Sequence, residues 1–199
     1  MSSDAWKNSY RHFCDAVSFD LMEPESIVEE ASRWLGGTVD FQEAQLSASY
    51  HTNWGSSRWI HAGIEHGFVT TFGGPAGGQV PVNVLFYPGG EDSIRGFAYG
   101  QAAPRASTGG FLGAKTFTLV NLELEQALTS KLSLVAFSDT LGAEARMADY
   151  PFRTPLYSLG LGVRLQTLIG PIRLEYGRNL NPRPADPSGT LQFSVGFPF

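Results

Sequence analysis

Apolar and polar residues alternate with a period of two along most of this 199-residue chain. The last stretch shows the pattern most clearly, with apolar residues at every second position: Leu191, Phe193, Val195, Phe197 and Phe199. Successive side chains of a β-strand point to opposite faces of its sheet, so each such stretch gives one apolar and one polar face. The chain is therefore expected to be all-β and antiparallel.

About nine segments carry this alternation, and they span residues 13–21, 44–50, 60–68, 80–86, 114–128, 131–139, 157–165, 170–179 and 190–199. Residues 25–34 instead place apolar side chains at spacings of four and three after a proline, which predicts one short surface helix. Tight turns and long loops rich in Gly and Pro separate the strands. Short turns at one rim and long loops at the other are typical of outer-membrane barrels.

A soluble antiparallel sandwich or barrel would also alternate, but its polar face is usually rich in charge. Here the polar faces consist mainly of Gly, Ser, Thr and Gln, and only 17% of the residues are charged, against about 25% in ordinary soluble domains. Aromatic residues also gather near the predicted strand ends, as they do in the interfacial girdles of membrane barrels. The pattern favours a transmembrane β-barrel.

Several functions find no support in the sequence. The net charge is −5 and no basic run occurs, so we expect no nucleic-acid binding. Cys14 is alone, which excludes a disulfide framework within the chain. His61 and His66 would face opposite sides of a strand and could not share a metal, and His12 and His51 have no nearby partner pattern. We expect a protein that is not an enzyme, without catalytic residues, metal or cofactor.

Four motifs follow one another between residues 86 and 177. Residues 86–97 join a Gly-Gly turn to an arginine flanked by Ile94 and Gly96, residues 121–124 read Asn-Leu-Glu-Leu, and residues 137–139 read Phe-Ser-Asp. The fourth motif comprises residues 160–164 and 169–177. Together with the terminal Phe, this series resembles the BamA/TamA superfamily of outer-membrane assembly and translocation proteins. The resemblance covers roughly residues 39–199, the C-terminal half of that barrel.

The resemblance implies roles for the loop motif, whose residues would be Gly89, Gly90, Ser93, Ile94, Arg95, Gly96 and Phe97. In this family the loop folds into the barrel lumen, and its arginine pairs with acidic residues of the wall. Carried over, Arg95 would pair with Glu123 and Asp139. Glu123 falls on the polar face of its predicted strand, which agrees with a luminal position, whereas the strand of Asp139 alternates weakly. The alternative is that Arg95 is a solvated loop residue.

The terminal strand resembles the signal by which the outer-membrane assembly machinery accepts new barrels. Its apolar positions would be Phe193, Val195, Phe197 and Phe199. Pro198 departs from the pattern and removes one backbone donor, which matters only if that N–H would pair at a seam.

The length sets a further constraint, because family barrels have sixteen strands and this chain supplies about half. We assign residues 1–38 to an N-terminal strand and the short helix, and residues 39–199 to the barrel portion. The edges of an open half-barrel would be unsatisfied in lipid. The chain could be the C-terminal part of a longer protein, a small barrel of eight strands, or one half of a homodimer. No signal peptide is recognisable, and this favours the first solution.

The predicted function is insertion or translocation of β-rich proteins in a bacterial-type outer membrane, or in an organelle outer membrane of bacterial origin. The expected partners are outer-membrane lipid, unfolded β-barrel substrates, and periplasmic accessory proteins reached through upstream domains. The alternative is a passive barrel, such as a pore, a surface antigen, or an anchor for an upstream passenger or enzyme.

Overall fold

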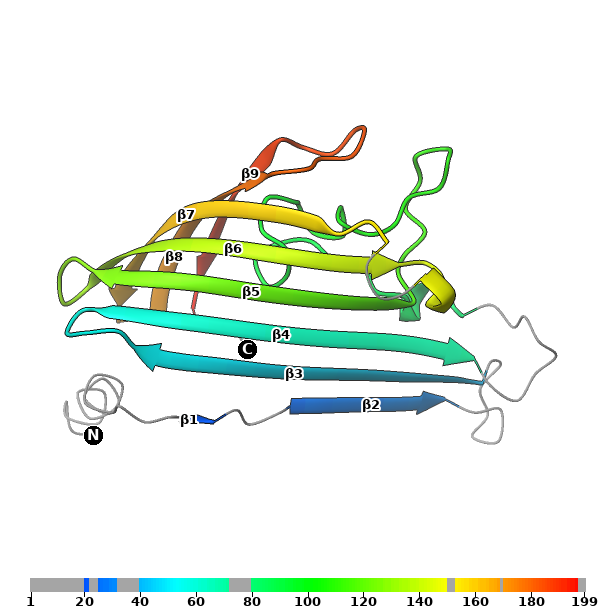
Figure 1. Cartoon of the computed structure of the whole chain (residues 1–199), viewed down its shortest axis with the longest axis horizontal. Coiled ribbons are helices and arrows are strands. Elements are labelled where there is room, and N and C mark those ends of the chain that lie inside the picture. The colour runs from blue at the N-terminus through cyan, green and yellow to red at the C-terminus, as the bar shows by residue number, and fades with distance from the viewer. Residues whose placement is uncertain are drawn as a thin grey trace.

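The computed structural model describes residues 20–21, 25–31, 40–71, 80–149, 153–168 and 170–196, which form one antiparallel sheet of nine strands (Figure 1). The strands are β1 (Asp20–Leu21), β2 (Glu25–Ala31), β3 (Phe41–Asn53), β4 (Arg58–Thr71), β5 (Thr116–Ala127), β6 (Leu132–Glu144), β7 (Leu156–Thr167), β8 (Gly170–Asn179) and β9 (Gly189–Val195). From β3 onward each strand pairs with the next, and both β1 and β2 pair with β3.

The described sheet is curved but does not close on itself (Figure 1). Within the described residues, β9 pairs only with β8, and no strand lies beyond β1 and β2. Among the described residues, two short 3₁₀ helices, η2 (Val82–Val84) and η3 (Met147–Asp149), lie in loops. In the part of the chain that the structure describes, no helix is long and apolar enough to cross a membrane.

The helix predicted for residues 25–34 is wrong, because Glu25–Ala31 form strand β2. This strand pairs residue by residue with β3, from Glu25 opposite Ser47 to Ala31 opposite Phe41. Residues four apart, such as Ile27 and Ala31, share a face in a helix and also in a strand, so this short apolar pattern suits both. Strand β3 determines that this segment is a strand, because it supplies the inter-strand hydrogen bonds that an isolated strand would lack.

The strand predicted at residues 80–86 is also wrong. This segment contains the 3₁₀ helix η2 (Val82–Val84) and forms only one isolated bridge, between Phe86 and Ala114. The adjacent edge of β4 is already occupied by β5 over Arg58–Phe68, which leaves the segment no long partner. Conversely, β6 extends beyond the predicted residue 139 to Glu144, because β5 pairs with it up to Thr116.

Two predicted features lie wholly or partly outside the described residues. Only Asp20–Leu21 of the strand predicted at residues 13–21 is described, and Phe197 and Phe199 of the terminal strand are not.

The outer face of the sheet exposes apolar side chains, whereas the inner face combines polar side chains with buried apolar ones such as Phe137 and Leu141. On β7 the outward Tyr157, Leu159, Leu161, Val163 and Leu165 are exposed, while the inward Ser158 is fully buried. The same parity leaves Leu122 and Leu124 of β5 exposed and turns Glu123 inward. A water-soluble sheet would bury these leucines, so this arrangement is that of a barrel wall whose outer face meets lipid.

The connections differ at the two ends of the sheet. The β3–β4, β5–β6 and β7–β8 turns are short and lie at one rim. Long connections join β4 to β5, β6 to β7 and β8 to β9 at the other rim, and the β4–β5 connection folds back against the inner face. The predicted asymmetry of the rims is therefore present.

We expect Leu161→Arg to lower the free energy of unfolding in lipid vesicles by about 2–4 kcal/mol, the usual cost of arginine at the lipid-facing midplane. The Leu161 side chain is 69% exposed on the outer face of β7. Denaturant titration followed by tryptophan fluorescence would measure the change. Leu161→Phe, which keeps the site apolar, is the control, and equal stability of the two variants would contradict a lipid-facing position.

Candidate functional site

The β4–β5 connection is anchored to the inner wall on both sides of Arg95. Gly89 and Gly90 adopt φ angles of +126° and +111°, which favour glycine. The Gly90 N–H donates to the Phe97 carbonyl at 3.1 Å and closes residues 90–97 into a compact turn. Ile94 and Phe97 are buried in an apolar cluster whose other members are Phe117 and Leu119 of β5, Leu141 of β6, Leu156 of β7 and Ala102. Arg95 is therefore held between two apolar anchors.

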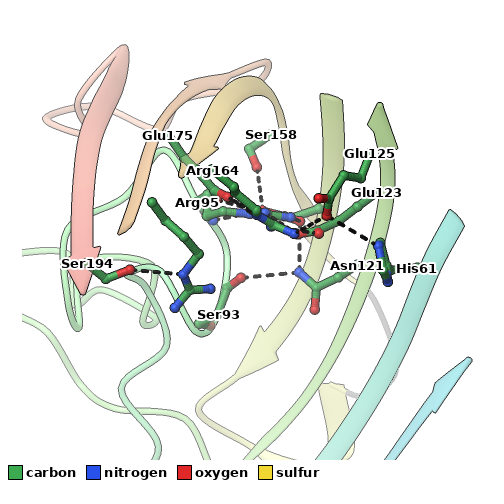
Figure 2. Close-up of polar contacts among 12 residues, drawn as sticks. His61, Ser93, Arg95, Asn121, Glu123, Glu125, Ser158, Arg164, Glu175 and Ser194 are labelled. Carbon is green, nitrogen blue, oxygen red and sulfur yellow. Dashed lines mark hydrogen bonds and ion pairs between the residues drawn. The ribbon is translucent and has the colours of Figure 1, made fainter. Parts of the chain in front are cut away.

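Arg95 is 3% exposed and binds carboxylates from three strands (Figure 2). Asp139 of β6 accepts three of its hydrogen bonds, from the backbone N–H at 2.9 Å, from Nε at 2.9 Å and from Nη2 at 2.6 Å. Nη1 donates to Glu123 of β5 and, at 3.0 Å, to Glu175 of β8. These contacts use the planar fork of a guanidinium, which a lysine could not reproduce.

The wall beneath Arg95 is shaped by one aromatic ring and several glycines. The guanidinium carbon lies 3.5 Å from the centroid of the Phe137 ring. A Cβ at Gly160 would run into this ring, and one at Gly162 would run into the Glu175 side chain. The glycines of β7 therefore leave the space in which Phe137 and Glu175 lie under the loop.

Arg164 of β7 forms a second centre in the same cluster. Its Nη2 donates to Glu123 at 2.8 Å and to Glu175 at 2.9 Å, and its Nη1 donates to Glu125 at 3.1 Å. Glu123 and Glu175 each use one oxygen for Arg95 and the other for Arg164. The two arginines are thus joined through shared carboxylates into one network across β5, β6, β7 and β8.

The network contains more negative than positive charge, with four carboxylates (Glu123, Glu125, Asp139 and Glu175) around two guanidinium groups. Burial by itself would lower the pKa of Arg95. The hydrogen bond and charge of Asp139, with the charges of Glu123 and Glu175, outweigh burial and raise this pKa above its ordinary value. Arg95 is therefore a permanent cation fixed in a polar, largely enclosed site.

The loop also contacts the last hairpin, β8–β9. Gly96 lies against the Gly177 backbone of β8, and a Cβ at Gly96 would meet the Asn179 amide oxygen. The Gln192 side chain of β9 donates to the Phe97 carbonyl at 3.2 Å. Arg183, between β8 and β9, donates to the carbonyls of Gln101 and Ala103 at 3.0 Å each. The loop is thus bonded to both strands of this hairpin and to its connection.

The structure brings together the three residues that sequence reasoning paired: Arg95, Glu123 and Asp139. The loop residue Ser93 is close by, and its carbonyl accepts from Asn121 at 3.3 Å. Sequence reasoning did not assign Glu175 and Arg164 to the cluster. Both lie on the predicted polar faces of their strands, and this position alone indicated that they could point inward. Their convergence on Arg95 depends on the strand register, which the alternation does not specify.

The terminal-strand residues Phe193 and Val195 are exposed on the outer face, away from the arginine cluster, while Phe197 and Phe199 lie outside the described residues. Among the side chains that the structure describes, no group of three His, Cys, Asp or Glu residues is arranged to hold a metal ion.

A family model described as the Omp85 superfamily domain matches residues 26–199. The chain belongs to the Omp85 superfamily. Among curated Omp85-type relatives, the outer membrane protein assembly factor BamA of Nitratidesulfovibrio vulgaris (strain Hildenborough) is 30% identical over 168 residues, which cover 81% of this chain and 21% of that protein. The family resemblance deduced from the four motifs is thereby confirmed.

The Omp85 fold is also found in the crystal structure of BamA from Haemophilus ducreyi lacking POTRA domains 1-3. That structure matches with a TM-score of 0.65 at 20% identity, over 78% of this chain and 34% of that one. The predicted outer-membrane barrel fold is confirmed. The chain spans about a fifth of the length of the curated relative and about a third of the solved chain.

We expect Asp139→Ala to lower the free energy of unfolding by about 3–5 kcal/mol, because it leaves Arg95 buried without its main partner. The control is Asp149→Ala, which removes a carboxylate paired with Arg153, a side chain that is 72% exposed. Such an exposed pair contributes only about 0–1 kcal/mol. Denaturant unfolding in lipid vesicles would measure both variants, and equal losses would show that the Asp139 contact is not a buried one.

Gly96→Ala is expected to displace the loop from the wall, because Gly96 combines a φ of +102° with close contact to β8. Gly109→Ala is a matched control, since Gly109 has a φ of +90° but nothing within 4 Å of an added Cβ. Both variants carry a backbone strain of about 1–3 kcal/mol, and only Gly96→Ala adds a clash. Limited proteolysis of the loop would distinguish them, and equal protection would argue against tight docking.

Proposed function

We propose that this Omp85 chain forms part of the barrel of a protein that inserts or translocates β-rich proteins in a bacterial-type outer membrane. The barrel acts without a catalytic residue. It contributes a wall with a strand edge at which another strand can pair. Beside this edge, the β4–β5 connection is held in one position against the inner face. Lipid contacts the apolar outer face, and unfolded β-barrel substrates are the partners of the edge.

The observation that carries this proposal is the docking of Arg95 on carboxylates of β5, β6 and β8. Burying several charges is costly, and well-packed apolar residues often stabilise a protein as well as a buried ion pair does. A cluster of this kind is better explained by the need to hold the loop in one defined position. A passive pore or membrane anchor needs only a closed wall and makes no such demand.

The edge strand supports the same proposal. Strand β9 is the last strand of the described sheet, in which it hydrogen-bonds to β8. In this proposal the second edge of β9 is the seam at which a substrate strand adds. The loop reaches this region through Gln192 of β9, whose side chain contacts the Phe97 carbonyl. Main-chain pairing would supply affinity for a substrate strand without reading its sequence, which suits an activity on many different barrels. The named function of the BamA relative, outer membrane protein assembly, is consistent with this mechanism.

The test compares Arg95→Ala, Arg95→Lys and the unchanged full-length protein in lipid vesicles, with the folding rate of a substrate barrel as the readout. Loss of about 3–5 kcal/mol of docking energy would leave the loop undocked in most molecules, so we expect Arg95→Ala to slow assembly by about tenfold or more. Arg95→Lys keeps the charge but not the fork and should give an intermediate rate. Arg153→Ala, on the exposed pair with Asp149, is the control.

The stability of the variant barrels is measured in parallel by denaturant unfolding. An unchanged assembly rate for Arg95→Ala in a stable barrel would contradict the proposed function and favour the passive barrel. A slower rate in a barrel that remains folded would support it.

A further inference from the structure

Two histidines form a cross-strand pair on the inner wall beside the arginine cluster. His51 of β3 lies directly opposite His61 of β4. Opposed residues of an antiparallel hairpin alternate between hydrogen-bonded and non-hydrogen-bonded pairs. The Trp54 N–H donates to the Arg58 carbonyl at 2.9 Å, so Trp54–Arg58 is a hydrogen-bonded pair. His51–His61, three positions further along, is therefore a non-hydrogen-bonded pair. Side chains approach each other most closely at such pairs. The two Nδ1 atoms are 2.6 Å apart, so both ring nitrogens converge on one point.

Glu125 of β5 lies beside one of the two rings. Its carboxylate is 3.6 Å from His61 Nε2 (Figure 2), whereas His61 Nδ1 is the atom that faces His51. A carboxylate at this position favours a proton on Nε2 and therefore leaves the Nδ1 lone pair of neutral His61 directed at His51. Metal-binding histidines are commonly held in this way, with the non-ligating nitrogen facing a carboxylate.

The surroundings favour a cation. Glu125 belongs to the network in which four carboxylates surround two arginines, so the adjacent wall carries excess negative charge. His51 is exposed on the inner face. Imidazole nitrogen suits Zn²⁺, Cu²⁺ and Ni²⁺ better than it suits Mg²⁺ or Ca²⁺.

We propose that His51 and His61 form a binding site for a transition-metal cation, with Nδ1 of each ring as ligand and Glu125 as the positioning residue for His61. Metal–nitrogen bonds of about 2.0–2.1 Å would separate the two nitrogens to about 3.3 Å, a change that small side-chain rotations supply. No third protein ligand is in place among the described residues, so water completes the coordination. The bound cation would join β3 to β4 near their short turn.

The experiment uses the full-length protein without a polyhistidine tag, in detergent, titrated with Cu²⁺ alone and observed by electron paramagnetic resonance. The expected result is one bound Cu²⁺ per chain that shows coupling to two imidazole nitrogens and is lost in both His51→Asn and His61→Asn. Glu125→Gln should weaken binding by about tenfold, the usual effect of removing a carboxylate behind a ligating histidine. Titration with Zn²⁺, monitored by calorimetry, should rank the variants in the same order of affinity.

His66→Asn is the matched control, because His66 also lies on β4 but on the opposite face, where its Nδ1 contacts the Thr118 hydroxyl at 2.9 Å. This variant should bind as the unchanged protein does. Cu²⁺ binding that survives His51→Asn, or that disappears in His66→Asn, would overturn the proposal. Absence of binding would also overturn it.

Discussion

The contact between Arg95 and Asp139 is the interaction on which the arrangement of the loop depends. Asp139 is fully buried and accepts from both the backbone and the side chain of Arg95, so it fixes the path of the chain and the direction of the guanidinium together. Together with the flanking anchors Ile94 and Phe97, Asp139 holds Arg95 where Glu123 and Glu175 can reach it. Neither charge would be stable at this depth without the other, because an unpaired buried ion is strongly destabilising.

The bilayer explains why such a cluster lies inside the wall. Lipid takes the place of a protein core on the outer face, so Leu161 and its neighbours on β7 need no protein partner. The inner face can then carry charge, and it becomes enclosed only where the loop covers it. Ile94 and Phe97 exclude water beside Arg95, which strengthens the ion pairs within their reach. Apolar packing and charge pairing are therefore neighbouring parts of one docking surface.

The alternation of inward and outward side chains along the strands could be predicted from the sequence. It placed Glu123 on the inner face and identified β8 over residues 170–179, and the loop motif pointed to Arg95. Three features could not be predicted in this way. Residues 25–31 have spacings that suit a helix and a strand equally, so the outcome depended on β3. Residues 80–86 alternate like a strand but have no free strand edge to join. Glu175, Arg164 and the His51–His61 pair meet their partners only through strand register, which follows from turn geometry.

The shared carboxylates make docking of the loop depend on the register of the wall strands. Side chains alternate with a period of two, so a slip of one residue between β5 and β6 would turn either Glu123 or Asp139 towards lipid and take it away from Arg95. The same holds for Glu175 on β8. A misregistered wall would thus present too few acceptors, and the loop could not settle on it. In physical terms, the position of the loop and the register of the wall strands are therefore coupled, because each is compatible with the other in one arrangement only.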